Sequence, residues 1–199
     1  MTRDTQQHIY NSAKRIFAER GYDGLSMRTL AREVGISLSS IYHYYPDKDV
    51  LLKDIFDSTN TILGRERSKL PQVRRFEDAL LQRITFQFDH IEDIVFVLKY
   101  YLHNRSDFRK QAHGWVPEKA SLHIEEILSV AKANKELRPS LDISAEAKMI
   151  THLINGFLLE YYPATPKGQE KRQLISHLQA FILRSVTVQT TTEVPMHES

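Results

Sequence analysis

A short stretch of the chain gathers side chains that can bond to nucleic acid. The outer positions of a helix predicted over residues 37–45 carry hydroxyl, imidazole, aromatic and small apolar groups: Leu38, Ser39, Tyr42, His43 and Tyr44. Hydroxyls and imidazole can bond base edges or phosphates, whereas a carboxylate would face the negative charge of the polyanion. The first carboxylate comes at Asp47, and Lys48 then offers an ammonium group beside the free N–H groups of the next helix, which favour a phosphate. This is the surface that a helix in a major groove needs.

The residues just before this helix predict another helix. Four apolar residues recur at i, i+3, i+4 and i+7, as on the buried face of an amphipathic helix: Met27, Leu30, Ala31 and Val34. Ser26 is a candidate N-cap. Gly35 is expected to end the helix, because a residue without a Cβ atom adopts the left-handed conformation at low energetic cost. Ser37 can cap the next helix, which Pro46 interrupts. Helix, short turn and helix form the DNA-binding helix-turn-helix pattern, and the alternative is a surface αα-hairpin with exposed aromatic residues.

Residues 9–56 resemble the N-terminal domain of the TetR family of bacterial transcriptional regulators. The matching residues form three runs in one order at fixed spacing: Ala13, Phe17, Gly21 and Tyr22; Leu30, Ala31, Gly35, Ile36 and Ser37; Ile41, Tyr42, Tyr44, Tyr45, Lys48, Leu51 and Leu52. The resemblance implies that Tyr42 and Lys48 contact phosphates and that Arg28 reaches a base or phosphate. It also implies that five positions read the base sequence: Leu38, Ser39, Ser40, His43 and Tyr44. Leu38 departs from a polar pattern, and it either contacts a thymine methyl group or packs on the start of the helix.

The resemblance also implies a regulator that responds to a ligand. In this family an inducer binds between the helices of the C-terminal part, and the last two long helices pair with their copies in a second subunit. Aromatic and histidine residues are the candidate ligand contacts: Phe86, Tyr100, Tyr101, His103, Trp115, His123, Phe157, Tyr161 and Tyr162. Each of them alone is more often an ordinary core residue. As a set they predict a mainly apolar cavity for a small, largely hydrophobic molecule, either an acyl thioester or a drug-like aromatic compound.

The composition bounds the class of protein. The 199 residues contain no cysteine, which excludes disulfides, thiol catalysis and thiolate metal sites. The longest uninterrupted apolar run, residues 94–98, is far shorter than a membrane span, and the N-terminus lacks the apolar core of a signal peptide. We therefore expect a cytoplasmic protein that does not enter a membrane. The net charge of +2 lies within residues 1–48, which hold seven Lys and Arg residues against five Asp and Glu residues.

The helical periodicity predicts an all-α protein of about nine helices. They are expected over residues 4–20, 27–34, 37–45, 48–68, 116–134, 145–162 and 169–188, with two more between 76 and 104 that bend near 90–92. Asp47 and Ser144 are further candidate N-caps. Residues 1–47 form a predicted three-helix DNA-binding domain and residues 48–188 a ligand-binding and dimerisation domain. Residues 105–114 are expected to be a loop, and residues 189–199 a disordered tail.

Metal binding and catalysis find little support in the sequence. His123 and Glu126 stand at i, i+3 on one predicted helix face, but no paired histidine and carboxylate signature accompanies them. The chain has no G-x-S-x-G motif and no glycine-rich phosphate loop. We therefore expect no metal, no cofactor and no enzyme activity.

Two hypotheses follow. The first is a homodimeric repressor that a small hydrophobic ligand releases from a palindromic DNA operator. The second is an α-helical protein-interaction module, or an enzyme that turns over the ligand of the C-terminal cavity, without DNA binding.

Overall fold

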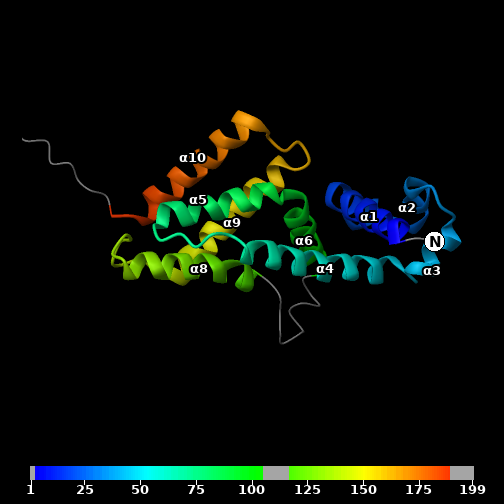
Figure 1. Cartoon of the computed structure of the whole chain (residues 1–199), viewed down its shortest axis with the longest axis horizontal. Coiled ribbons are helices and arrows are strands. Elements are labelled where there is room, and N and C mark those ends of the chain that lie inside the picture. The colour runs from blue at the N-terminus through cyan, green and yellow to red at the C-terminus, as the bar shows by residue number, and fades with distance from the viewer. Residues whose placement is uncertain (1–2, 105–116, 189–199) are drawn as a thin grey trace, which may run out of the picture.

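The computed structural model describes residues 3–104 and 117–188, and within these ranges the protein is all-α, as predicted (Figure 1). The only β pairing in the described ranges is an isolated bridge between Leu137 and Thr187. None of the described helices is both long enough and apolar enough to cross a membrane. Trp115 and the predicted loop over residues 105–114 lie outside the described residues, as does the predicted tail.

Nine helices make up the described part of the chain, in agreement with the predicted number. Their bounds are α1 Arg3–Gly24, α2 Met27–Val34, α3 Leu38–Tyr44, α4 Lys48–Ser68, α5 Phe76–Asp89, α6 Ile91–His103, α8 Pro117–Ala133, α9 Ile143–Tyr161 and α10 Gly168–Val186. The predicted bend near residues 90–92 is confirmed, because His90 separates α5 from α6. The first helix runs to Gly24 and not to residue 20, but it is interrupted at Gly21, whose φ of 72° is open to glycine at low cost.

Side-chain caps fix the starts of the helices around the predicted DNA-binding stretch. Ser26, Ser37 and Asp47 each accept a hydrogen bond from the backbone N–H three residues later, at 3.0, 3.1 and 2.8 Å. These three predicted caps are confirmed. The predicted cap Ser144 is wrong, because Asp142 caps α9 through the N–H of Ala145 and the Ser144 hydroxyl donates instead to Glu125.

The first three helices enclose a small core at one end of the molecule (Figure 1). Its central side chains are fully buried: Ile9, Ala13, Phe17, Leu30 and Ile41. α4 leaves this end and runs toward the remaining helices, packing against both α1 and α6. Tyr10 on α1 holds α4 by donating its hydroxyl to the Ile55 carbonyl at 3.2 Å. α4 is therefore a continuous connection between the N-terminal helices and the rest of the protein.

A second connection joins α1 to α6. The Phe17 ring meets the Phe96 ring edge to face, with 5.2 Å between the ring centroids. The Lys99 ammonium donates to the carbonyl of Ala18, and Lys14 forms an ion pair with a carboxylate of α6. Because apolar and polar contacts both cross this interface, the N-terminal helices are held on α6 as well as on α4.

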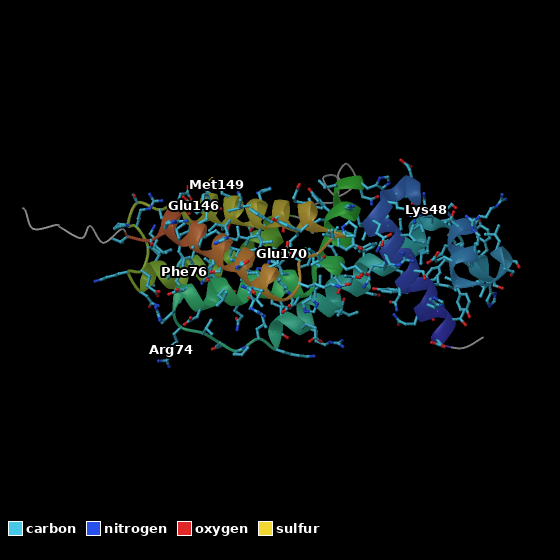
Figure 2. All side chains as sticks on the ribbon, turned by 90° about the horizontal axis from the view of Figure 1, so that it is seen from above. Lys48, Arg74, Phe76, Glu146, Met149 and Glu170 are labelled. Atoms are coloured by element: carbon cyan, nitrogen blue, oxygen red, sulfur yellow. The ribbon has the colours of Figure 1, made fainter. Side chains whose placement is uncertain are left out.

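The remaining helices form a larger bundle in which α8 packs on α9 and α5 packs on α10. The inward faces of α9 and α10 are buried: Ile150, Ile154, Ile175, Leu178 and Ile182. Two large apolar side chains on these helices remain exposed, Met149 at 58% and Phe181 at 57%. Figure 2 shows Met149 on the outer edge of α9, away from the bundle.

Candidate nucleic-acid interface and ligand cavity

α3 has one buried face and one exposed face. Ile41 is fully buried and Tyr45 is nearly so, with its hydroxyl donating to Asp54 at 3.1 Å. On the opposite face Ser39 and His43 are exposed and Tyr42 is 49% exposed. The helix thus presents the hydroxyl and imidazole groups expected to meet DNA, while its inner residues fix its orientation.

The serine hydroxyls of α3 are partly occupied within the helix itself. Ser37 Oγ lies 2.9 Å from Ser39 Oγ and 2.7 Å from Ser40 Oγ, in addition to accepting the Ser40 N–H. A hydroxyl has both a donor hydrogen and acceptor lone pairs, so Ser39 keeps hydrogen-bonding capacity for a base edge or phosphate. Because these contacts gather around the N-cap, they hold the first turn of α3 in a defined geometry.

The other predicted base readers lie around this exposed face. Tyr44 and Leu38 are half-buried and pack against the core, while Arg28 is exposed at the start of α2. The ring of Tyr44 meets the ring of His43 edge to face at 5.8 Å. The position of Leu38 agrees with packing on the start of α3.

Lys48 is anchored to the end of α1. Its ammonium donates to the carbonyls of Tyr22 at 2.9 Å and Leu25 at 3.1 Å, and it lies 3.4 Å from the centroid of the Tyr22 ring. The Tyr22 hydroxyl donates to Asp49 at 2.6 Å, and this hydrogen bond, more than burial, raises the pKa of Tyr22 to about 12. Figure 2 locates Lys48 among the N-terminal helices. In this structure Lys48 joins the first turn of α4 to the end of α1, a role that the sequence did not indicate.

Replacing Lys48 by Met is expected to lower the free energy of unfolding by about 1–2 kcal/mol, because two charge-assisted hydrogen bonds and the contact with the Tyr22 ring are lost. Urea denaturation followed by circular dichroism measures this change. Lys53→Met, at an exposed lysine of the same helix paired with Asp57, is the control and should change stability by less than about 0.5 kcal/mol. A Lys48→Met protein as stable as the wild type would mean that these hydrogen bonds do not hold α4.

Among the described residues, at least three cavities lie in the C-terminal bundle. The largest of these three, about 730 Å³, lies between the loop before α5 and α8, and one of about 450 Å³ opens between α4 and α5. The smallest of the three, of about 190 Å³, is lined by residues of α4, α5, α6 and α9. Of the predicted ligand contacts, Phe86 lines the two smaller cavities and His123 lines the largest.

The other predicted ligand residues within the described ranges line none of these three cavities. Tyr100 and Tyr101 are buried, and the Tyr100 ring lies 4.6 Å from the Phe56 ring of α4. His103 stacks on Tyr22 with 3.9 Å between ring centroids, at the joint between α1 and α6. Phe157 and Tyr161 stack on one another along α9, and Tyr162 is partly buried against the core. Their assignment as ligand contacts stays a prediction.

Arg83 is a buried charged residue for which the sequence indicated no role. It stands on α5 three residues after Leu80 and four before Gln87, and so on the buried face of that helix. Its side chain lines the 190 Å³ cavity and is only 6% exposed. Burial, with the nearby charge of Arg67, lowers the pKa of Arg83 to about 10, so the guanidinium is charged at neutral pH. In the sequence, the spacing of Arg83 from Leu80 and Gln87 is the signal that places it on the buried face of α5.

His123 and Glu126 lie close together, as their spacing predicted, with 3.5 Å between Nδ1 and a carboxylate oxygen. Burial and the charges of Arg83 and Arg67 lower the pKa of His123, although Glu126 acts in the opposite direction. Among the residues that the structure describes, no three His, Cys, Asp or Glu side chains are grouped so that they could hold a metal.

Comparison with known proteins agrees with this geometry. Residues 9–55, which include α2, α3 and the start of α4, match the model of bacterial regulatory proteins of the tetR family. A helix-turn-helix transcriptional repressor from Mycobacterium tuberculosis is 28% identical over 59% of this chain, and the alignment spans 59% of that repressor's length. The transcriptional regulator PksA from Bacillus subtilis is 22% identical over 94% of this chain and 92% of its own length.

The fold of the whole described chain also has solved counterparts. The ketosteroid transcriptional regulator KstR2 of Mycobacterium tuberculosis superposes with a TM-score of 0.71 over 95% of this chain and 98% of that one, at 16% identity. The N-terminal match, the regulators that align with the chain and the shared fold lead to one conclusion. The N-terminal part of the chain, residues 9–55, carries the DNA-binding domain of the tetR family of bacterial regulatory proteins, and the chain as a whole shares its fold with solved regulators.

Proposed function

We propose that this protein is a homodimeric repressor whose two α3 helices bind successive major grooves of a palindromic operator. The observation that carries the proposal is the exposed face of α3, where Ser39, Tyr42 and His43 stand free of carboxylates above a fully packed inner face. These groups can bond phosphates and base edges. Arg28 on α2 adds a cation beside them. We expect the protein to act in the cytoplasm and to catalyse no reaction.

Dimerisation has both a structural and a functional reason. A seven-residue helix reads few bases, and two copies about 34 Å apart read a palindrome with useful specificity. The exposed apolar side chains Met149 on α9 and Phe181 on α10 support a pairing of these two helices with their copies. Gly156 on the exposed side of α9 would permit a close approach of the partner helix.

Control by a small ligand would act through α4. This helix carries Lys48 at its start, and near its end Asn60, Leu63, Gly64 and Arg67 line the 190 Å³ cavity. A ligand that binds better to a conformer with displaced α4 would shift the population toward it, and the two α3 helices would then no longer match successive grooves. By thermodynamic linkage, operator DNA must weaken ligand binding by the same factor.

Selection from a random duplex library with the purified protein tests the proposal. The expected result is an enriched sequence with two inverted half-sites, centred about 10 base pairs or a multiple of this apart. The same library with Tyr42→Ala protein is the control and should yield no enrichment. If the wild-type protein enriches no sequence, DNA binding is wrong and a protein-interaction module becomes the better reading.

A further inference from the structure

The cavity lined by Arg83 contains a buried positive charge that the described protein does not neutralise. Arg83 is 6% exposed, and its Nε atom has no hydrogen-bond partner. No ion pair of Arg83 is found among the residues whose side chains the structure describes. Burying a charge without a partner destabilises the folded protein, and apolar side chains of similar size are often more stable at such positions. Arg83 therefore does not stabilise the fold at this position, and the stability of the protein gives no reason for its presence there.

The charge of Arg67 adds to this positive potential. Arg67 on α4 lines the same cavity, and its charge is one of the causes that lower the pKa of Arg83. His123 on α8 responds to both arginines in the same direction. Glu126 lies beside His123 and is the carboxylate that acts on that histidine, whereas no carboxylate is among the groups that act on the pKa of Arg83. Arg67 and Arg83 therefore repel one another across the space between α4 and α5.

The other walls of the cavity define the rest of the ligand. Five apolar side chains line it: Leu63, Phe86, Ile94, Val97 and Leu98. Three amide side chains complete it: Asn60, Gln87 and Asn155. Gln87 donates weakly to Asn155 at 3.4 Å, and its Oε1 atom is buried without a partner. The cavity thus combines an apolar surface with polar groups that lack full hydrogen bonding.

We propose that this cavity binds a small organic carboxylate, with its carboxylate on Arg83 and an apolar body about the size of one aromatic ring against the apolar walls. A guanidinium binds a carboxylate through two parallel hydrogen bonds, which no uncharged ligand reproduces. The volume of 190 Å³ sets the size, since a cavity of about 150 Å³ holds benzene. That the carboxylate acts as the inducer rests on the proposed function.

Binding of the anion would also act on α4. Attraction of a carboxylate by Arg67 and Arg83 replaces their repulsion, so the ligand draws the end of α4 toward α5. Because Lys48 joins the other end of α4 to α1, a displacement of α4 reaches the helices expected to bind DNA. The ligand class and the control of DNA binding thus follow from the same pair of arginines.

Isothermal titration of the full-length protein tests the ligand class. The probes are benzoate, phenylacetate and hexanoate, with benzamide as a neutral analogue and acetate as an anion without an apolar body. We expect at least one of the three larger carboxylates to bind, and at least about tenfold more tightly than benzamide and acetate. If none of the three binds, or if benzamide binds as tightly as benzoate, the proposal is overturned.

Binding measurements on variants test whether Arg83 binds the carboxylate. Arg83→Met and Arg83→Gln should both weaken carboxylate binding at least about tenfold. Arg65→Gln, at an exposed arginine on the same helix as Arg67, is the matched control and should bind as the wild type does. Unchanged binding in both Arg83 variants would contradict the assignment.

The DNA selection on ligand-free protein separates the two proposals. A protein that selects an operator but binds none of the carboxylates is a regulator without this anion site. A protein that binds a carboxylate through Arg83 but selects no duplex has the anion site and lacks the proposed function.

Discussion

Alanine in place of Phe17 is expected to lower the free energy of unfolding by about 3–5 kcal/mol. Phe17 is fully buried, and its ring lies against Phe96 at 5.2 Å and Tyr100 at 6.3 Å, both on α6. The substitution removes these contacts and leaves a cavity between α1 and α6. For a chain of this size the midpoint of thermal unfolding should fall by about 6–20 °C.

Thermal and urea denaturation of the purified variant measure this loss. Tyr42→Ala removes an aromatic ring that is 49% exposed, and it should change stability by less than about 0.5 kcal/mol. Both variants lose an aromatic ring, but only Phe17 is buried, so the difference in their stabilities measures the effect of burial. A Phe17→Ala protein that loses less than about 1 kcal/mol would mean that α1 and α6 are not packed together as described.

Tyr42→Ala is instead expected to weaken binding to the selected operator roughly one hundredfold to ten thousandfold. The phenolic hydroxyl is expected to donate to a phosphate, and a hydrogen bond to a charged group contributes about 1.5–3 kcal/mol. A dimer loses two such hydrogen bonds, so the binding free energy should weaken by about 3–6 kcal/mol. Because the Tyr42 ring is half exposed, the folded protein should be little affected.

Fluorescence anisotropy with a labelled duplex measures this effect. Tyr42→Phe keeps the ring and removes the hydroxyl, so it should show most of the loss if the phosphate contact carries the energy. Thr61→Ala, at an exposed position in the middle of α4, is the control and should bind as the wild type does. Equal affinity for wild-type and Tyr42→Ala protein would remove Tyr42 from the interface.

Local signals in the sequence predicted the helix-turn-helix segment well. The caps Ser26, Ser37 and Asp47 and the helix end at Gly35 depend on residues within one turn of one another. Gly35 adopts φ 75°, as its left-handed position requires. The local signal did not show which of two nearby residues caps α9. Ser144 donates a hydrogen bond to Glu125 of α8, and Asp142 is the cap.

Features that depend on contacts between distant residues could not be read from spacing. Lys48 bonds to carbonyls more than 20 residues earlier in the chain, and no local pattern indicates this. The burial of Arg83 could not be predicted from its position on an apolar helix face, because arginine is rarely buried without a partner. The stacking of His103 on Tyr22 likewise depends on how α6 packs against α1.

Sequence-specific DNA binding through α3 is tested most directly by a fluorescence anisotropy titration at several salt concentrations. Wild-type protein is titrated against the selected duplex and a shuffled duplex of the same length. We expect the selected duplex to bind at least about a thousandfold more tightly, with the logarithm of affinity falling linearly with the logarithm of salt concentration. Equal affinity for the two duplexes, or an affinity that does not change with salt, would contradict the proposed function.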